Sequence, residues 1–162
     1  MRDVYGKSVL TTLEEIVRPC HTALIVVDVQ NDFVHPDGLG GRRGDLSAVT
    51  AMLPVLQRLL AAARSAGVQP IFVQNTNYPD ARTSAEGDLA RRVKLWGEGE
   101  PLSCQVDTWG REFAEGTRPE PEDITVAKYR NCGFTGTNLD MILRAGAMRT
   151  IVVTGVATHA CV

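Results

Sequence analysis

Four short runs of apolar residues predict β-strands. The first, residues 23–28, is continuously apolar up to a closing acid, and does not alternate with polar residues. Continuous apolarity is typical of a parallel strand that is covered on both faces. The other three runs cover residues 70–74, 124–127 and 150–154.

A long helix is predicted between the first two strands. Apolar residues recur at helical spacing through residues 48–66, and Gly67 is the expected C-terminal stop. A proline in a helix interior removes a hydrogen bond. We therefore expect regular helix only from about Ala51, with Pro54 in its first turn.

The second half of the chain is less regular. A helix is predicted over residues 137–145, with Thr137 as N-cap and Gly146 as stop. Residues 76–121 form an irregular excursion, in which residues 89–93 predict only a short helix. An excursion of this length inside a compact domain is usually functional.

The order strand, helix, strand, excursion, strand, helix, strand predicts an open, mostly parallel α/β sheet with helices on both faces. Residues 1–21 are interpreted as an N-terminal extension, with a short helix that starts at Thr12 and stops before Pro19. Residues 22–162 form the domain, and residues 29–44 are expected to be a loop.

Composition excludes several classes of protein. The formal net charge is -2, so no basic surface for nucleic acid or an anionic membrane is expected. The four cysteines form no C-x-x-C pair, which argues against a zinc knuckle or a disulfide framework. No apolar run approaches the roughly 20 residues of a membrane span, and no signal peptide is recognised. We expect a cytoplasmic, reducing location.

Chemically useful residues follow the predicted strands. Asp28, Asn75 and Lys128 come at the ends of the first three strands, and Cys161 follows the fourth. Ligands of open α/β sheets bind outside the carboxyl ends of the strands. The topology therefore predicts that an acid, a base and a thiol lie at one edge of the sheet.

These residue types suit nucleophilic catalysis. A neighbouring ammonium and a helix N-terminus both lower the pKa of a thiol, so Lys128 is expected to activate Cys161. Asp28 would take the thiol proton and return it to a leaving amine. Taken singly, Asp28 is as well explained as a cap, Lys128 as a surface lysine and Cys161 as a small buried hydrophobe.

Three motifs, in order, resemble the isochorismatase-like cysteine hydrolases. They are Asp28-Val-Gln-Asn-Asp-Phe33, Lys128 ahead of Gly133-Phe-Thr-Gly-Thr-Asn-Leu-Asp140, and Gly155-Val-Ala-Thr-His-Ala-Cys-Val162. The resemblance implies a Rossmann-like sheet, a homo-oligomer, and a catalytic triad of Asp28, Lys128 and Cys161. It also implies a cis peptide between Val156 and Ala157, with the N–H groups of Ala157 and Cys161 facing an oxyanion.

The subfamily follows from particular residues. Isochorismatases of siderophore pathways lack the nucleophilic cysteine, so Cys161 favours hydrolysis of a C–N bond. The region after the second strand carries no histidine, unlike the metal set of nicotinamidases, so we expect neither a metal nor a cofactor. The chain looks most like ureidoacrylate amidohydrolases, whose relatives hydrolyse biuret and N-carbamoylsarcosine. A nicotinamidase, or another small-amide hydrolase of the family, is the alternative.

Five residues are candidates for substrate binding: Phe33, Asn75, Tyr78, Arg130 and Phe134. For the two phenylalanines, packing in the core is as plausible as substrate binding. For Arg130, a structural ion pair is equally plausible. Trp96 and Trp109 either cover the site or anchor the excursion. The remaining cysteines, at positions 20, 104 and 132, are interpreted as structural thiols.

Two other classes of protein remain open. One is a non-catalytic member of the fold that binds a small molecule or supports assembly. The other is a flavodoxin-like or nucleotide-binding domain, which the lack of G-x-G-x-x-G after the first strand disfavours. Because members of the family continue beyond the nucleophile, we expect the C-terminal part of the domain to be missing from this chain.

Overall fold

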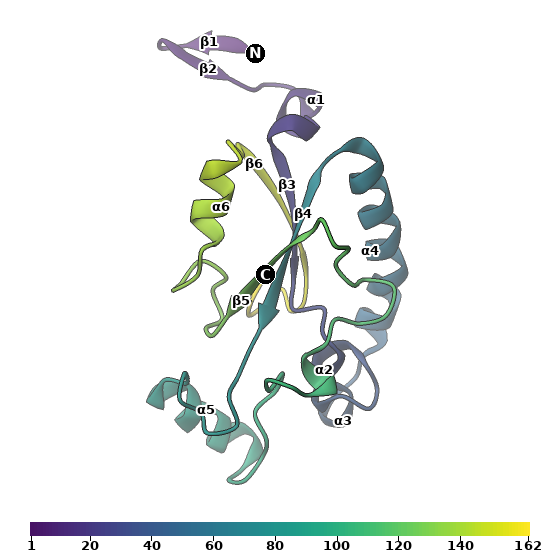
Figure 1. Ribbon diagram of the computed structural model, residues 1–162, viewed down its shortest axis with the longest axis vertical. Helices are drawn as coiled ribbons and strands as arrows, with labels where there is room; N and C mark the ends of the chain where they lie inside the picture. Colours follow the sequence, from purple (N-terminus) through teal and green to yellow (C-terminus); the bar gives the residue numbers. More distant parts are fainter.

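The computed structural model describes residues 1–162 and contains a main sheet of four parallel strands. The strands lie in the order β5-β4-β3-β6 (Figure 1). Their bounds are β3 (Thr22–Val27), β4 (Gln69–Asn75), β5 (Ile124–Lys128) and β6 (Thr150–Gly155). The predicted parallel α/β sheet is confirmed, and each predicted strand is present to within one or two residues.

Helices cover both faces of this sheet. The long helix α4 (Ser47–Ala66) lies against one face and α6 (Leu139–Ala145) against the other (Figure 1). Successive residues of a strand point to opposite faces. Leu24 of β3 accordingly belongs to the apolar cluster on the α4 side, and Ile25 to the cluster on the α6 side.

Helix α4 begins earlier than predicted. It starts at Ser47, so that Pro54 lies well beyond the first turn, and the expected start near Ala51 is wrong. The carboxylate of Asp45 accepts the Ser47 N–H at 2.8 Å and satisfies one of the free donors at the helix start. The predicted stop is confirmed, because Gly67 has the left-handed φ of 76° that closes the helix.

The second half of the chain also departs from the prediction in detail. Helix α6 has Asn138 as its N-cap. The Thr137 hydroxyl still accepts the Leu139 N–H at 3.2 Å, so the expected capping side chain acts one residue outside the helix start. Helix α5 (Glu86–Trp96) is longer than the predicted residues 89–93.

Residues 29–44 are more ordered than the predicted loop. They contain the short helices α2 (Asn31–Val34) and α3 (Leu39–Arg43). The two helices are joined because Asp32 of α2 accepts the Leu39 N–H at 3.3 Å. No local sequence pattern records this contact, and the sequence therefore does not predict the two short helices.

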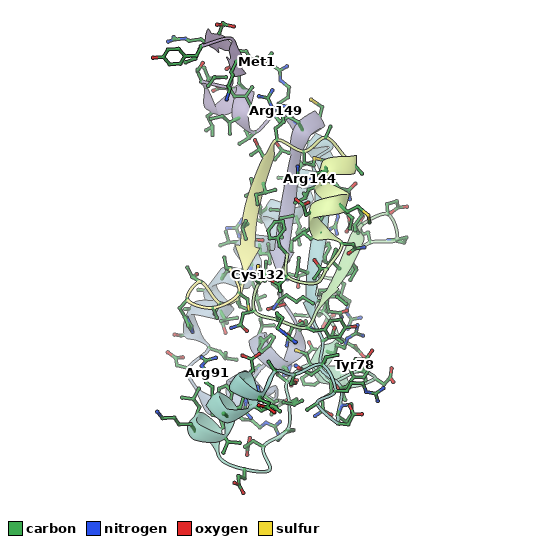
Figure 2. All side chains as sticks on the ribbon, turned by 90° about the vertical axis from the view of Figure 1, so that its left-hand side faces the viewer. Met1, Tyr78, Arg91, Cys132, Arg144 and Arg149 are labelled. Carbon is green, nitrogen blue, oxygen red and sulfur yellow. The ribbon has the colours of Figure 1, made fainter.

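The N-terminal residues lie at one end of the main sheet (Figure 1). They form an antiparallel hairpin and two short helical segments: β1 (Arg2–Val4), β2 (Lys7–Val9), α1 (Leu13–Ile16) and η1 (Pro19–His21). Thr12 caps α1 as expected, by accepting the Glu15 N–H at 3.3 Å. Met1 and Arg149 lie together at this end (Figure 2), and the Arg149 guanidinium donates to Ser8 O at 3.3 Å. No helix combines the length and the apolarity of a membrane span.

Candidate active site

Three of the predicted residues meet beyond the carboxyl ends of the strands. Lys128 Nζ lies 2.8 Å from Asp28 Oδ2 and donates to Cys161 Sγ at 3.3 Å. Its third contact is with Arg130 O at 3.1 Å. The ion pair and the two hydrogen bonds fix the position of the nitrogen between the acid and the thiol.

Burial makes this arrangement electrostatically strong. The Lys128 and Asp28 side chains are 0% and 1% exposed, although both carry charge. Charged groups are rarely buried without a partner, because they lose their hydration. The fully buried ammonium therefore depends on the carboxylate, and the carboxylate on the ammonium.

Asp28 stands where β3 leaves the sheet. Its N–H still donates to Val73 O of β4 at 2.9 Å, but its φ of 55° lies in the left-handed region. Aspartate is one of the few residue types that adopt this conformation. Asp28 Oδ1 accepts the Asn75 N–H at 3.0 Å. Oδ2 is the oxygen that forms the ion pair with Lys128 Nζ.

The pKa values of the acid and the thiol are both displaced upward. Burial raises the pKa of Asp28, and the Lys128 ammonium opposes this rise. Burial is also the main reason that the pKa of Cys161 is raised, with the Asp28 carboxylate adding to it and Lys128 opposing it. Lys128 lowers the pKa of Cys161, as expected, but burial and the Asp28 carboxylate outweigh its effect, so the net shift is upward. A thiol in this environment needs a base to take its proton, and Asp28 lies beside it.

A tight turn carries Cys161 from β6 to the other two residues. It begins at Gly155, which has a φ of 117° and at which a Cβ would lie 2.0 Å from Val27 O. The peptide bond between Val156 and Ala157 is cis.

The end of the turn closes on the Ala157 carbonyl. This oxygen accepts the N–H groups of Ala160, Cys161 and Val162 at 2.9, 3.1 and 3.3 Å. The Cys161 N–H therefore does not face an oxyanion as expected, because this helix-like turn uses it internally. The Ala157 N–H makes none of the hydrogen bonds of the turn.

Three of the candidate substrate-binding residues have different surroundings. Phe33 packs against the core cluster on the α4 side, whereas Phe134 is 45% exposed. Asn75 touches Asp28 through its main-chain N–H.

Tyr78 of the excursion and Arg130, which follows β5, lie in the same region, because Arg130 bonds to Thr83 of the excursion. Tyr78 stacks on Tyr129 with ring centroids 6.1 Å apart. Arg130 makes no ion pair; its Nη1 donates to Thr83 O and to Tyr129 O. Arg130, Tyr129 and Thr83 line an open pocket of about 290 Å³. None of Asp28, Lys128 and Cys161 lines this pocket. Arg130 connects it to the site, because the Arg130 carbonyl contacts Lys128 Nζ.

Polar residues just after Asp28 fasten the excursion to the site, a role that the sequence did not reveal. Gln30 Nε2 donates to Arg111 O at 2.8 Å and Asn31 Nδ2 to Trp109 O at 2.9 Å. Asp32 Oδ2 accepts the Cys104 N–H at 2.6 Å. The only signal was a run of polar residues directly after a buried strand.

The two tryptophans anchor different parts of the excursion. Trp109, in η2 (Trp109–Arg111), packs edge-on against the His35 ring at 4.9 Å. Trp96, at the end of α5, lies beneath the guanidinium groups of Arg43 and Arg92 at 4.5 and 5.0 Å. Both rings pack against partners that hold them in place, which favours the role of anchoring the excursion over that of covering the site.

The remaining cysteines differ from one another. Cys104 is buried, which raises its pKa well above the ordinary range, and only this thiol fits the expected structural role. Cys20 and Cys132 are exposed. The pKa of Cys132 is lowered by hydrogen bonds, first from the Thr135 hydroxyl and then from nearby main-chain N–H groups. No three His, Cys, Asp or Glu side chains are grouped so as to hold a metal ion.

A parallel α/β sheet with an acid, an ammonium and a thiol beyond its strand ends defines a hydrolase-like domain with a candidate cysteine nucleophile. The chain belongs to the isochorismatase family, because the family's domain model matches residues 22–162. It is 33% identical over 159 residues to ureidoacrylate amidohydrolase RutB of Agrobacterium fabrum. The aligned region covers 90% of this chain and 68% of that protein.

Two solved structures show the same fold. A cysteine hydrolase from Pseudomonas syringae pv. phaseolicola superposes with a TM-score of 0.72 and 30% identity, over 90% of this chain and 64% of that one. N-carbamoylsarcosine amidase from Thermoplasma acidophilum gives a TM-score of 0.65 and 30% identity, over 87% and 70%. The chain thus spans about two thirds of the length of its relatives, and 63% of RutB from Rhizobium rhizogenes.

Proposed function

We propose that the domain hydrolyses a carbon–nitrogen bond of a small ureido or carbamoyl amide through an acyl-enzyme on Cys161. The observation that carries the proposal is the position of Lys128 Nζ, 2.8 Å from Asp28 Oδ2 and 3.3 Å from Cys161 Sγ. The class of substrate is supported by relatives named ureidoacrylate amidohydrolase and N-carbamoylsarcosine amidase.

In the first half-reaction, Asp28 Oδ2 takes the thiol proton and Cys161 Sγ attacks the amide carbonyl carbon. A raised pKa makes Asp28 a stronger base than an ordinary carboxylate. The Lys128 ammonium and the Ala157 N–H stabilise the oxyanion that forms. The C–N bond then breaks, Asp28 returns the proton to the leaving nitrogen, and a thioester remains on Cys161.

In the second half-reaction, water replaces the amine. Asp28 takes a proton from the water as the oxygen attacks the thioester carbonyl, and the proton returns to Cys161 as the C–S bond breaks. The products are ammonia or an amine and a carboxylic or carbamic acid. No cofactor takes part in these steps.

The open pocket beside Lys128 is the proposed place for the rest of the substrate. Its walls include Tyr129 and Arg130, and Tyr78 stacks on the tyrosine. We propose that Asn75 and Tyr78 contact the ureido group and that Phe134 closes the exposed side. Arg130 Nη1 is already bonded to carbonyl oxygens, so we assign Arg130 to shaping the pocket, and Phe33 to supporting it from the core.

The test measures ammonia release from ureidoacrylate, N-carbamoylsarcosine, biuret and nicotinamide. We expect a ureido or carbamoyl compound to be the best substrate and Cys161→Ala to reduce its rate by about 1,000-fold or more. Cys132→Ala removes an exposed thiol and is the matched control, with an unchanged rate. Mass spectrometry of quenched reactions should show the substrate's acyl group on the peptide that contains Cys161.

Two outcomes would contradict the proposal. Ammonia release that persists in Cys161→Ala would exclude the thiol as nucleophile. Binding of an amide without turnover by the unaltered protein would support the non-catalytic class instead.

A further inference from the structure

On the side that faces β3, the end of β4 lacks a strand neighbour. The last main-chain bond between β3 and β4 runs from the Asp28 N–H to Val73 O, at 2.9 Å. Strand β4 continues to Asn75, whereas β3 ends at Val27. The main-chain N–H and C=O of Asn75 therefore require partners other than a strand, because buried main-chain groups are almost always hydrogen-bonded.

The amide of Gln30 supplies those partners. Gln30 is fully buried. Its Oε1 accepts the Asn75 N–H at 2.8 Å, and its Nε2 donates to Asn75 O at 2.9 Å. One side-chain amide thus pairs with both main-chain groups of Asn75, as the next residue of a neighbouring strand would.

The same N–H also holds the acid. It lies 3.0 Å from Asp28 Oδ1, so the atom that orients the carboxylate is itself held by Gln30. With Oδ1 fixed in this way, Oδ2 is directed to Lys128 Nζ. We infer that Gln30 is a positioning residue, which aims the Asp28 carboxylate through the main chain of Asn75; this inference rests on the proposed function of Asp28 as proton acceptor.

A purely structural role for Gln30 is the competing explanation. Its Nε2 also donates to Arg111 O at 2.8 Å and so fastens the excursion. Gln74, another buried glutamine, donates to the same oxygen at 3.0 Å. The side-chain amide of Gln74 makes no hydrogen bond with Asp28 or with the Asn75 N–H, and this makes Gln74 the matched control.

The test compares Gln30→Met, Gln74→Met and Asp28→Asn with the unaltered protein. The main readout is the pH dependence of Cys161 alkylation by iodoacetamide, followed for that peptide by mass spectrometry. Asp28 and Lys128 are the ionisable groups that act on the thiol, and Cys104 is a further ionisable neighbour of Asp28. This readout needs no knowledge of the substrate.

We expect Gln30→Met to shift the midpoint of alkylation by at least half of the shift that Asp28→Asn causes, and in the same direction. Gln74→Met should keep the original midpoint. With the best amide substrate, Gln30→Met should lower kcat by about 10- to 100-fold, as expected for a misplaced catalytic group. Its KM should change less than about threefold, and Gln74→Met should leave both constants within about twofold.

Equal effects of Gln30→Met and Gln74→Met on midpoint and kcat would overturn the inference. If Gln30→Met does not fold, Gln30→Asn decides by the same criteria, because it keeps an amide that is too short to reach Asn75. A different result separates the two proposals: if Asp28→Asn leaves both the midpoint and ammonia release unchanged, the proposed role of Asp28 fails, whatever Gln30 does.

Discussion

Lys128 Nζ lies 2.8 Å from Asp28 Oδ2, in an ion pair whose two side chains are 0% and 1% exposed. The pair connects the end of β5 to the end of β3, with β4 between them. Neither residue follows the other closely in sequence, so only the sheet order creates the contact. The buried pair is therefore part of the candidate site, and substitutions in it test whether the strands are arranged as described.

Removing one partner of this pair should destabilise the fold strongly. Lys128→Met leaves the Asp28 carboxylate buried without its ammonium, and we expect a loss of about 3–5 kcal/mol in the free energy of unfolding. The double variant Lys128→Met/Asp28→Leu should lose less than the sum of its single variants. Urea denaturation measures these differences.

The exposed pair of Arg144 and Asp140, 2.7 Å apart on α6, provides the control. Arg144→Ala should change stability little, because water screens exposed ion pairs. A Lys128→Met variant as stable as Arg144→Ala would show that the buried pair does not form.

The thiols should react with iodoacetamide in an order set by their surroundings. Burial and the Asp28 carboxylate raise the pKa of Cys161, so its alkylation should increase with pH only above the range of an ordinary cysteine. The pKa of Cys132 is lowered, so Cys132 should react at a lower pH. Cys104 should stay unmodified in the folded protein because it is buried.

Single substitutions test the causes of the pKa shifts of Cys161 and Cys132. Asp28→Asn removes the negative charge that raises the pKa of Cys161, and its alkylation midpoint should move to lower pH. Thr135→Val removes the hydroxyl bonded to Cys132, and should slow alkylation of that residue alone. Faster alkylation of Cys161 than of Cys132 at neutral pH would contradict the described surroundings of both thiols.

Gly155→Ala should disrupt the turn that carries the nucleophile. The φ of 117° at this position is strained for any other residue, which costs about 1–3 kcal/mol. In addition, the new Cβ would lie 2.0 Å from Val27 O. We expect a large fall in Tm and loss of amide hydrolysis. Gly87→Ala, where a Cβ meets nothing within 4 Å, should not lower Tm; equal Tm values for the two variants would refute the close approach.

Asp32→Ala should loosen the excursion. The Cys104 N–H, now 2.6 Å from Asp32 Oδ2, would be buried without a partner, at a cost of about 1–3 kcal/mol. We expect faster limited proteolysis within residues 103–113 and lower resistance to urea. Asp37→Asn alters an exposed acid between α2 and α3 and should leave both the proteolysis pattern and the resistance to urea unchanged. An unaltered cleavage pattern in Asp32→Ala would mean that other contacts hold the excursion.

Several features were accessible from local sequence patterns. The strand after Thr22 is continuously apolar, and such a run has few ways to be buried other than in a parallel sheet. Gly67 predicted a helix end because its left-handed conformation is available to few other residues. The positions of Asp28 and Lys128 directly after apolar runs predicted that they lie at one edge of the sheet.

The sequence by itself determined the sheet and the residue types at its edge, because periodicity and chain order are local properties. Only the tertiary structure decided that the pKa of Cys161 is raised, since that depends on burial and on the distance to Asp28. It also decided that Gln30 pairs with Asn75 at the end of β4, on the side that faces β3. Pairings between distant residues arise when the chain folds, and no local pattern of polar and apolar residues records them.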